Sequence, residues 1–151
     1  MKAKVDAKKI NLLFVKTLKS NIEVGSNFIK KEGQEYHLSL GQESGLNLDE
    51  KKVAFTLKVL IEFPNSIKDA KAQAEFVLQF LFEVKNLDEL AKVEDDGAIT
   101  VSGELSLTLA GIAYSTARGI ILNTTEQSTI RGILLPVISP AKLFTEGKIQ
   151  L

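Results

Sequence analysis

The sequence contains no cysteine and only one histidine. The lack of cysteine excludes disulfides, thiolate nucleophiles and zinc–thiolate sites, and it is compatible with a reducing cytosol. A single histidine falls short of the converging set of ligands that a metal site needs, so His37 is predicted to be a solvated strand residue. We therefore expect neither a metal nor another cofactor.

An excess of charge of either sign is also lacking, because 19 lysine and arginine residues balance 19 aspartate and glutamate residues. Nucleic-acid binding depends largely on the neutralisation of phosphates by basic side chains, so this composition does not predict a nucleic-acid partner. The zero net charge also leaves little self-repulsion to oppose association between copies of the chain.

Long hydrophobic runs are missing as well. The start, Met1–Asp6, is charged and leads into no uninterrupted apolar run of signal-peptide length. No uninterrupted run further on approaches the roughly 18 apolar residues that span a bilayer. With 44% hydrophobic and 25% charged residues, a chain of 151 residues is predicted to form one domain over 1–151. We expect a cytoplasmic protein without a membrane partner.

The motifs of common catalytic sites are absent. Ser102 and Ser115 have no histidine near them in sequence, and neither a Gly-x-Ser-x-Gly motif nor a glycine-rich phosphate loop occurs. Residues 94–96 are acidic but lack the spacing of a calcium-binding loop, so they are predicted to form a solvated turn. A pair of carboxylates that meets only in the folded chain stays open at this point, but the sequence does not predict an enzyme.

What the sequence does contain is apolar alternation with a period of two, which is typical of strands with one buried face. The alternating segments cover residues 10–24, 36–40, 53–63 and 74–84. Turns or loops are predicted at 25–27, 41–50 and 64–66. Because no long helical pattern separates these segments, we predict a four-stranded antiparallel sheet.

The pattern then changes to a helical one. After a short helical turn at 86–91, Ser102 is a candidate N-cap, and apolar residues follow it at spacings of three and four as far as Ile121. Gly111 and Gly119 lie inside this helix and indicate either close packing or a break. A polar loop at 123–132, an extended apolar run at 133–138 and a short helix after Ser139 complete an α+β fold.

The sheet carries more apolar surface than one helix can cover. Phe55 and Phe76 belong to the face that the helix can bury, whereas Leu60, Val77 and Leu81 make the opposite face apolar as well. Two interpretations remain open: both faces are core or subunit interface, or part of this surface is a groove for apolar segments of another chain.

The order of the elements, and motifs late in the chain, resemble the SecB family of export chaperones. The family pattern has an arginine-bearing helix end, an apolar-Pro-Val segment and a Leu-Phe pair, and residues 117–118, 134–137 and 143–144 match it in order. The resemblance covers roughly residues 10–144. It implies a homotetramer, a dimer of dimers with its helices between the sheets, whose apolar grooves hold unfolded preproteins without ATP.

The resemblance also implies two sets of residues. Polypeptide-binding positions would be Tyr36, Leu38, Leu40, Phe55, Leu57, Phe76, Leu78, Leu143 and Phe144. Positions at the oligomer interface would be Leu109, Ile112, Ala113, Thr116 and Ile120.

Two departures from the family concern its export ATPase, which docks on acidic residues of the sheet. Only Glu23 remains of these, with Lys19 and Phe76 where carboxylates are expected, and the sequence ends at Leu151 without the acidic tail of the family. Both departures argue against docking to the export ATPase. Three hypotheses follow: a general export holdase, a dedicated chaperone of one partner such as an antitoxin in a toxin-antitoxin system, and a structural or regulatory oligomer.

Overall fold

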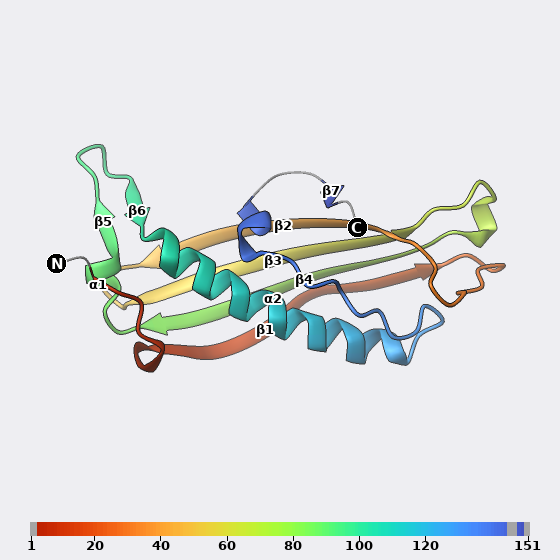
Figure 1. Ribbon diagram of the computed structural model, residues 1–151, viewed down its shortest axis with the longest axis horizontal. Helices are drawn as coiled ribbons and strands as arrows, with labels where there is room; N and C mark the ends of the chain where they lie inside the picture. The colour runs from red at the N-terminus through yellow and green to blue at the C-terminus, as the bar shows by residue number, and fades with distance from the viewer. Residues whose placement is uncertain (1–2, 145–147, 150–151) are drawn as a thin grey trace.

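The structure is a computed structural model, which describes residues 3–144 and 148–149. Its centre is an antiparallel sheet in the order β1-β4-β3-β2-β7, with a long helix, α2, across one face (Figure 1). The strands are β1 (Ile10–Val24), β2 (His37–Asn47), β3 (Lys52–Phe63), β4 (Ala72–Val84) and β7 (Lys148–Ile149). The predicted α+β fold, with four long antiparallel strands followed by a long helix, is confirmed.

The two central strands, β3 and β4, follow the predicted alternation most closely. Along β4 every second residue is buried from Ala72 to Val84, and β3 is buried at every second position from Val53 to Phe63. Their side chains pair in register, for example Phe55 with Phe80. Since both strands have neighbours on each side, their backbone groups are satisfied by the ladders, and their apolar faces form the core.

The predicted loop at 41–50 is wrong for its first part, because β2 continues to Asn47. From Gly41 onward β2 stays in register with β3, where Gly45 lies opposite Ala54. The second half of β2 is rich in glycine and polar residues, so it has no apolar alternation of its own. Pairing with β3 makes it a strand, and tertiary context overrides local propensity here.

The helix α2 spans Gly103–Glu126, and Ser102 is its N-cap, with a side chain that accepts a hydrogen bond from the Leu105 N–H at 3.5 Å. The helix runs without a break through both of its internal glycines, Gly111 and Gly119. A Cβ at Gly111 would lie 3.5 Å from Cγ of Pro140, whereas nothing lies within 4 Å of one at Gly119. Both distances leave room for a Cβ, so close packing explains neither glycine.

The predicted polar loop at 123–132 is wrong for residues 123–126, which form the last turn of α2. The hydroxyls of Thr124 and Thr125 donate to the carbonyls of Ile120 and Ile121, one turn back, at 2.8 and 2.7 Å. The hydroxyls of these polar side chains find hydrogen-bond partners within the helix, so the polar stretch does not end it.

The buried face of α2 packs against the sheet. By length and composition α2 could cross a bilayer, but its buried face identifies it as a core helix. The residues that it buries are Leu105, Leu109, Ala110, Ala113, Tyr114, Ala117, Ile121 and Thr125.

A small hairpin that lies between β4 and α2 in the sequence was not predicted. After α1 (Leu87–Leu90), strands β5 (Ala91–Val93) and β6 (Ile99–Val101) pair and project beyond the end of the sheet (Figure 1). The acidic residues 94–96 lie in its turn, where Asp96 accepts the Ala98 N–H at 2.9 Å. The prediction of a turn is confirmed, but strands of three residues are too short to show a periodicity.

The chain then crosses back over the sheet without regular secondary structure at 130–139, where Figure 1 shows it beside α2. This part of the chain leads into η3 (Pro140–Phe144), which confirms the position of the predicted short helix but is a 3-10 helix. Two further short 3-10 helices are η1 (Ala7–Lys9) and η2 (Lys68–Ala70). The prediction of one domain over 1–151 includes residues outside the described ranges and stays a prediction.

Candidate polypeptide-binding surfaces

Most of the residues predicted to bind a polypeptide lie in the core of the chain. Six of them belong to strands and are buried on the side of the sheet that α2, η3 and the residues leading to η3 cover. Leu143 of η3 is buried in the same core. A client could contact them only after some of these covering elements had moved. They are Leu38, Leu40, Phe55, Leu57, Phe76, Leu78 and Leu143.

The other two predicted residues reach the surface. Phe144 is 40% exposed, and its ring packs edge-on against Phe55 with centroids 6.5 Å apart. Tyr36 is half-buried, and its ring lies 5.6 Å from that of Phe63. Both mark the boundary between the core and the solvent-exposed surface on the α2 side of the sheet.

The segment 133–137, called the crossover segment below, is held by side chains and not by a neighbouring strand. Three successive carbonyls accept hydrogen bonds: Leu134 from the Tyr36 hydroxyl at 3.4 Å, Leu135 from Arg118 Nε at 2.8 Å, and Pro136 from the Tyr114 hydroxyl at 2.6 Å. The donors come from α2 and from the residue before β2. Elements distant in sequence therefore meet on one stretch of main chain.

Side chains alternate between the core and the solvent in the first part of the crossover segment. Ile133 and Leu135 are fully buried, and Leu134 between them is 57% exposed, as expected of an extended chain that lies on an apolar surface. The alternation ends after Leu135, because Val137 is 83% exposed at a position where it would be buried. The segment thus combines a buried apolar face with an exposed one.

Both tyrosine donors stay protonated over the physiological range. Burial raises the pKa of Tyr36, and it raises the pKa of Tyr114 from 10.0 to about 12, with Arg118 opposing this shift. A protonated phenol can donate to a carbonyl, whereas a phenolate cannot. These hydrogen bonds therefore persist at neutral pH.

The predicted interface residues on α2 divide into two groups. Leu109 and Ala113 are buried against the chain's own sheet. Ile112, Thr116 and Ile120 are only half-buried, so they remain accessible to another subunit.

A second apolar surface lies on β1, at the edge of the sheet, and was not predicted. Leu12, Leu13, Phe14 and Leu18 are between 38% and 50% exposed. The pairing of β1 with β4 shifts by one residue at Leu13 and again at Leu18, so both are the extra residues of bulges. A bulge changes which side a residue faces, and simple alternation does not reveal it. Four large apolar side chains consequently lie along an open strand edge.

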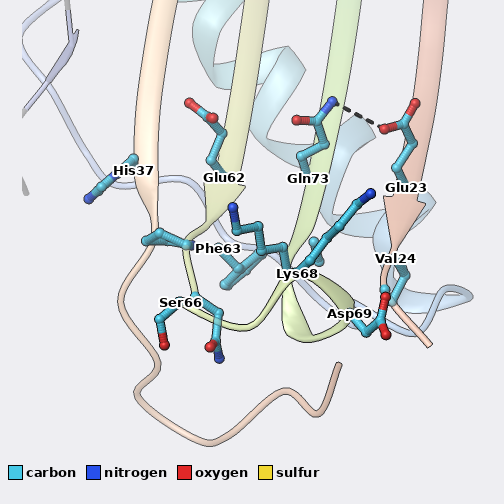
Figure 2. A pocket seen from close by; sticks show the side chains of 14 residues that line it. Glu23, Val24, His37, Glu62, Phe63, Ser66, Lys68, Asp69 and Gln73 are labelled. Carbon is cyan, nitrogen blue, oxygen red and sulfur yellow. Dashed lines mark hydrogen bonds between the residues drawn. The ribbon is translucent and has the colours of Figure 1, made fainter. Parts of the chain in front are cut away.

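The face of the sheet opposite α2 carries charged, polar and apolar side chains together, and the half-buried Leu60, Val77 and Leu81 lie on it as predicted. An open pocket of about 750 Å³ lies there beside the β3–β4 connection, and Figure 2 shows Glu23, Glu62 and Lys68 around it. Glu23 accepts a hydrogen bond from Gln73 at 3.5 Å. His37 is exposed on β2 opposite Glu62, as its predicted solvated position requires.

Carboxylates on this face are partly neutralised. Lys19 forms an ion pair of 2.9 Å with Glu75, and Lys58 forms one of 2.9 Å with Glu43. Among the residues that the structure describes, no group of three or more His, Asp or Glu side chains is placed to hold a metal ion. The face offers neither a continuous acidic surface nor a metal centre there.

No family model matches the sequence, and no curated protein matches it. Among solved structures, the Rv1957 SecB-like chaperone of Mycobacterium tuberculosis superposes with a TM-score of 0.55 at 18% sequence identity. The match covers 87% of this chain and 93% of that chain. The fold is SecB-like. The relative was solved in complex with a ChAD peptide from the Rv1956 HigA1 antitoxin.

The SecB-like fold agrees with the resemblance inferred from the sequence. Two of the short motifs meet in the structure, because Arg118 donates a hydrogen bond to the Leu135 carbonyl of the Leu-Pro-Val motif. The sequence did not identify Tyr114 as a partner of the same segment. A tyrosine on the apolar face of a predicted helix gives no signal beyond burial, since its hydrogen-bond partner follows 22 residues later.

Proposed function

We propose that this protein is an ATP-independent holdase that binds non-native polypeptides on apolar surface in the cytoplasm. The observation that carries this proposal is the SecB-like fold with large apolar side chains left exposed on β1, the crossover segment and η3. Clusters of exposed apolar side chains usually mark binding sites for other chains. Each Å² of apolar surface that a client covers contributes about 25 cal/mol, whatever the client's sequence.

The proposed assembly is a homotetramer, a dimer of dimers. Support comes from two surfaces: the open β1 edge with its exposed leucines, and the half-buried residues Ile112, Thr116 and Ile120 on α2. An unpaired apolar strand edge promotes pairing with another chain. Two separate self-association surfaces are what a dimer of dimers requires.

The clients would be unfolded preproteins for a general export holdase, or one partner for a dedicated chaperone. The paired charges at Lys19 and Glu75 favour the second alternative, because they weaken the acidic surface on which the export ATPase of SecB docks. The antitoxin peptide bound to the related Rv1957 chaperone suggests an antitoxin as that partner. A structural or regulatory oligomer without a client is the third candidate, in which all exposed apolar residues would be interface.

The test is the aggregation of a chemically unfolded client, followed by light scattering without ATP, together with the solution mass of the protein. We expect suppressed aggregation at the mass of a tetramer. Suppression with several unrelated clients would favour a general holdase. Tight binding of one partner only would favour a dedicated chaperone. A stable tetramer that binds no client would overturn the holdase function.

A further inference from the structure

The crossover segment is bound by the rest of the chain as a peptide ligand would be. Each of its three successive carbonyls, from Leu134 to Pro136, accepts a hydrogen bond from a side-chain donor and not from a neighbouring strand. Any polypeptide carries the same carbonyls, so donors of this kind recognise an extended main chain without reading its sequence.

The buried side chains of the segment support the same interpretation. Ile133 and Leu135 fill the core at alternate positions, while Leu134 between them points outward. The Ile133 N–H donates to Oγ1 of Thr125 at 2.9 Å, so a side chain of α2 also holds an amide of the segment. A client with apolar residues at alternate positions could make the same contacts.

We propose that Tyr36, Tyr114 and Arg118 form a binding site for the main chain of an extended apolar polypeptide, which the crossover segment fills when no client is bound. This inference rests on the proposed holdase function and specifies its site. It explains how predicted client-binding residues can be buried in the free chain: the client displaces the crossover segment and takes over its contacts. Exchange of one apolar segment for another leaves no polar group unpaired.

The turn before the segment and its exposed last residue are compatible with displacement. Arg131 and Gly132 have positive φ angles of 46° and 57°, so a turn separates α2 from the segment. Pro136 has no N–H group to satisfy, and Val137 is 83% exposed. Release of the segment therefore breaks side-chain contacts but no strand ladder.

The test uses a fluorescent peptide with the sequence of residues 131–139, titrated into the full chain and followed by anisotropy. Leu135→Ala weakens the internal segment, and we expect it to raise peptide affinity about tenfold or more over the unsubstituted protein. Leu134→Ala, at the adjacent exposed position, is the matched control and should leave the affinity unchanged. The milder Ile133→Val shifts affinity in the same direction as Leu135→Ala and serves if that variant does not fold.

A second comparison tests the donors themselves. Leu135→Ala is expected to release the internal segment, so only the peptide then uses the Tyr114 hydroxyl. Tyr114→Phe added to Leu135→Ala should therefore lower peptide affinity about fivefold, because the peptide loses the hydrogen bond that Pro136 had. If Tyr114 only held the internal segment in place, its loss would raise the affinity or leave it unchanged. That result would overturn the proposal, as would equal affinities of the folded Leu135→Ala and Leu134→Ala variants.

Client aggregation measured on the same samples separates this proposal from the holdase function. The unsubstituted protein could suppress client aggregation while Leu135→Ala has no effect on peptide affinity. That result would overturn the proposed binding site and still support the holdase function. Tighter peptide binding by Leu135→Ala without suppression would support the site and contradict the general holdase function.

Discussion

The hydroxyl of Tyr114, in the middle of α2, donates a hydrogen bond of 2.6 Å to the carbonyl of Pro136 in the crossover segment. Tyr114 is only 5% exposed, and its partly buried hydrogen bond joins the helix to a segment that has no strand partner in the described residues. Arg118, one turn further along α2, donates to the preceding carbonyl, that of Leu135. Two neighbouring side chains of one helix thus fix the path of the chain after it.

Tyr114→Phe removes this bond while keeping the ring. We expect the free energy of unfolding to fall by about 1 to 2 kcal/mol, since the partly buried Pro136 carbonyl loses its donor. Urea denaturation followed by circular dichroism measures the change. Tyr36→Phe is the matched control, and because its hydrogen bond is longer, at 3.4 Å, its effect should be smaller. Equal effects of the two substitutions would contradict the assigned role of Tyr114.

Alkaline pH should destabilise the fold through the same residue. Burial raises the pKa of Tyr114 from 10.0 to about 12, so the folded chain keeps a proton that the unfolded chain loses in this range. The contribution of Tyr114 to stability is therefore complete below pH 10 and is lost as the pH rises from about 10 to about 12. Urea midpoints between pH 8 and 12 measure this slope. Tyr114→Phe should flatten it, and an unchanged slope would refute the assignment.

How far the sequence predicts this fold depends on how each element is buried. β3 and β4 alternate strictly because neighbours on both sides and α2 on one face impose a period of two. The second half of β2 has no such pattern, since Gly41 and Gly45 face little that a side chain would contact. Its strand character arises from pairing with β3, which local sequence does not encode.

The candidate site was predicted less well than the fold, for two physical reasons. Alternation shows which side chains share a face but not what covers that face, so it did not reveal that Leu38 and Phe55 are buried in the free chain, and their binding role stays a prediction. The bulges at Leu13 and Leu18 turn residues out of the expected alternation, and a bulge has no reliable sequence signal. Both limits concern tertiary neighbours and not local conformation.

The two groups of predicted interface residues on α2 should respond differently to substitution. Ile112→Glu places a charge on a half-buried side chain, and we expect a smaller solution mass with the fold retained. Leu109→Ala instead leaves a cavity under α2 and should lower the free energy of unfolding by about 2 to 5 kcal/mol. Light scattering and urea denaturation of both variants make the comparison. An unchanged mass for Ile112→Glu would exclude this face of α2 from the assembly.

The turn after β1 depends on a close approach of two backbones. The Gly25 N–H donates to the Lys71 carbonyl at 2.8 Å, and a Cβ on Gly25 would collide with the Asp69 carbonyl. Gly25→Ala should therefore cost about 1 to 3 kcal/mol of stability, measured by urea denaturation. Gly45→Ala is the control, because no atom lies within 4 Å of a Cβ there. A loss of the same size at Gly45 would show that the close approach is not the cause.

The open edge of β1 should carry one of the contacts between subunits. Leu18 is 50% exposed at a bulge of this edge strand, close in sequence to the other exposed apolar residues of β1. Lysine on an edge strand opposes pairing with another chain, so Leu18→Lys should lower the solution mass measured by light scattering. Ile67→Lys introduces the same charge at a side chain that is 62% exposed in the β3–β4 connection, and it should leave the mass unchanged. An identical fall in both variants would indicate a general effect of charge, and no fall in Leu18→Lys would remove β1 from the interface.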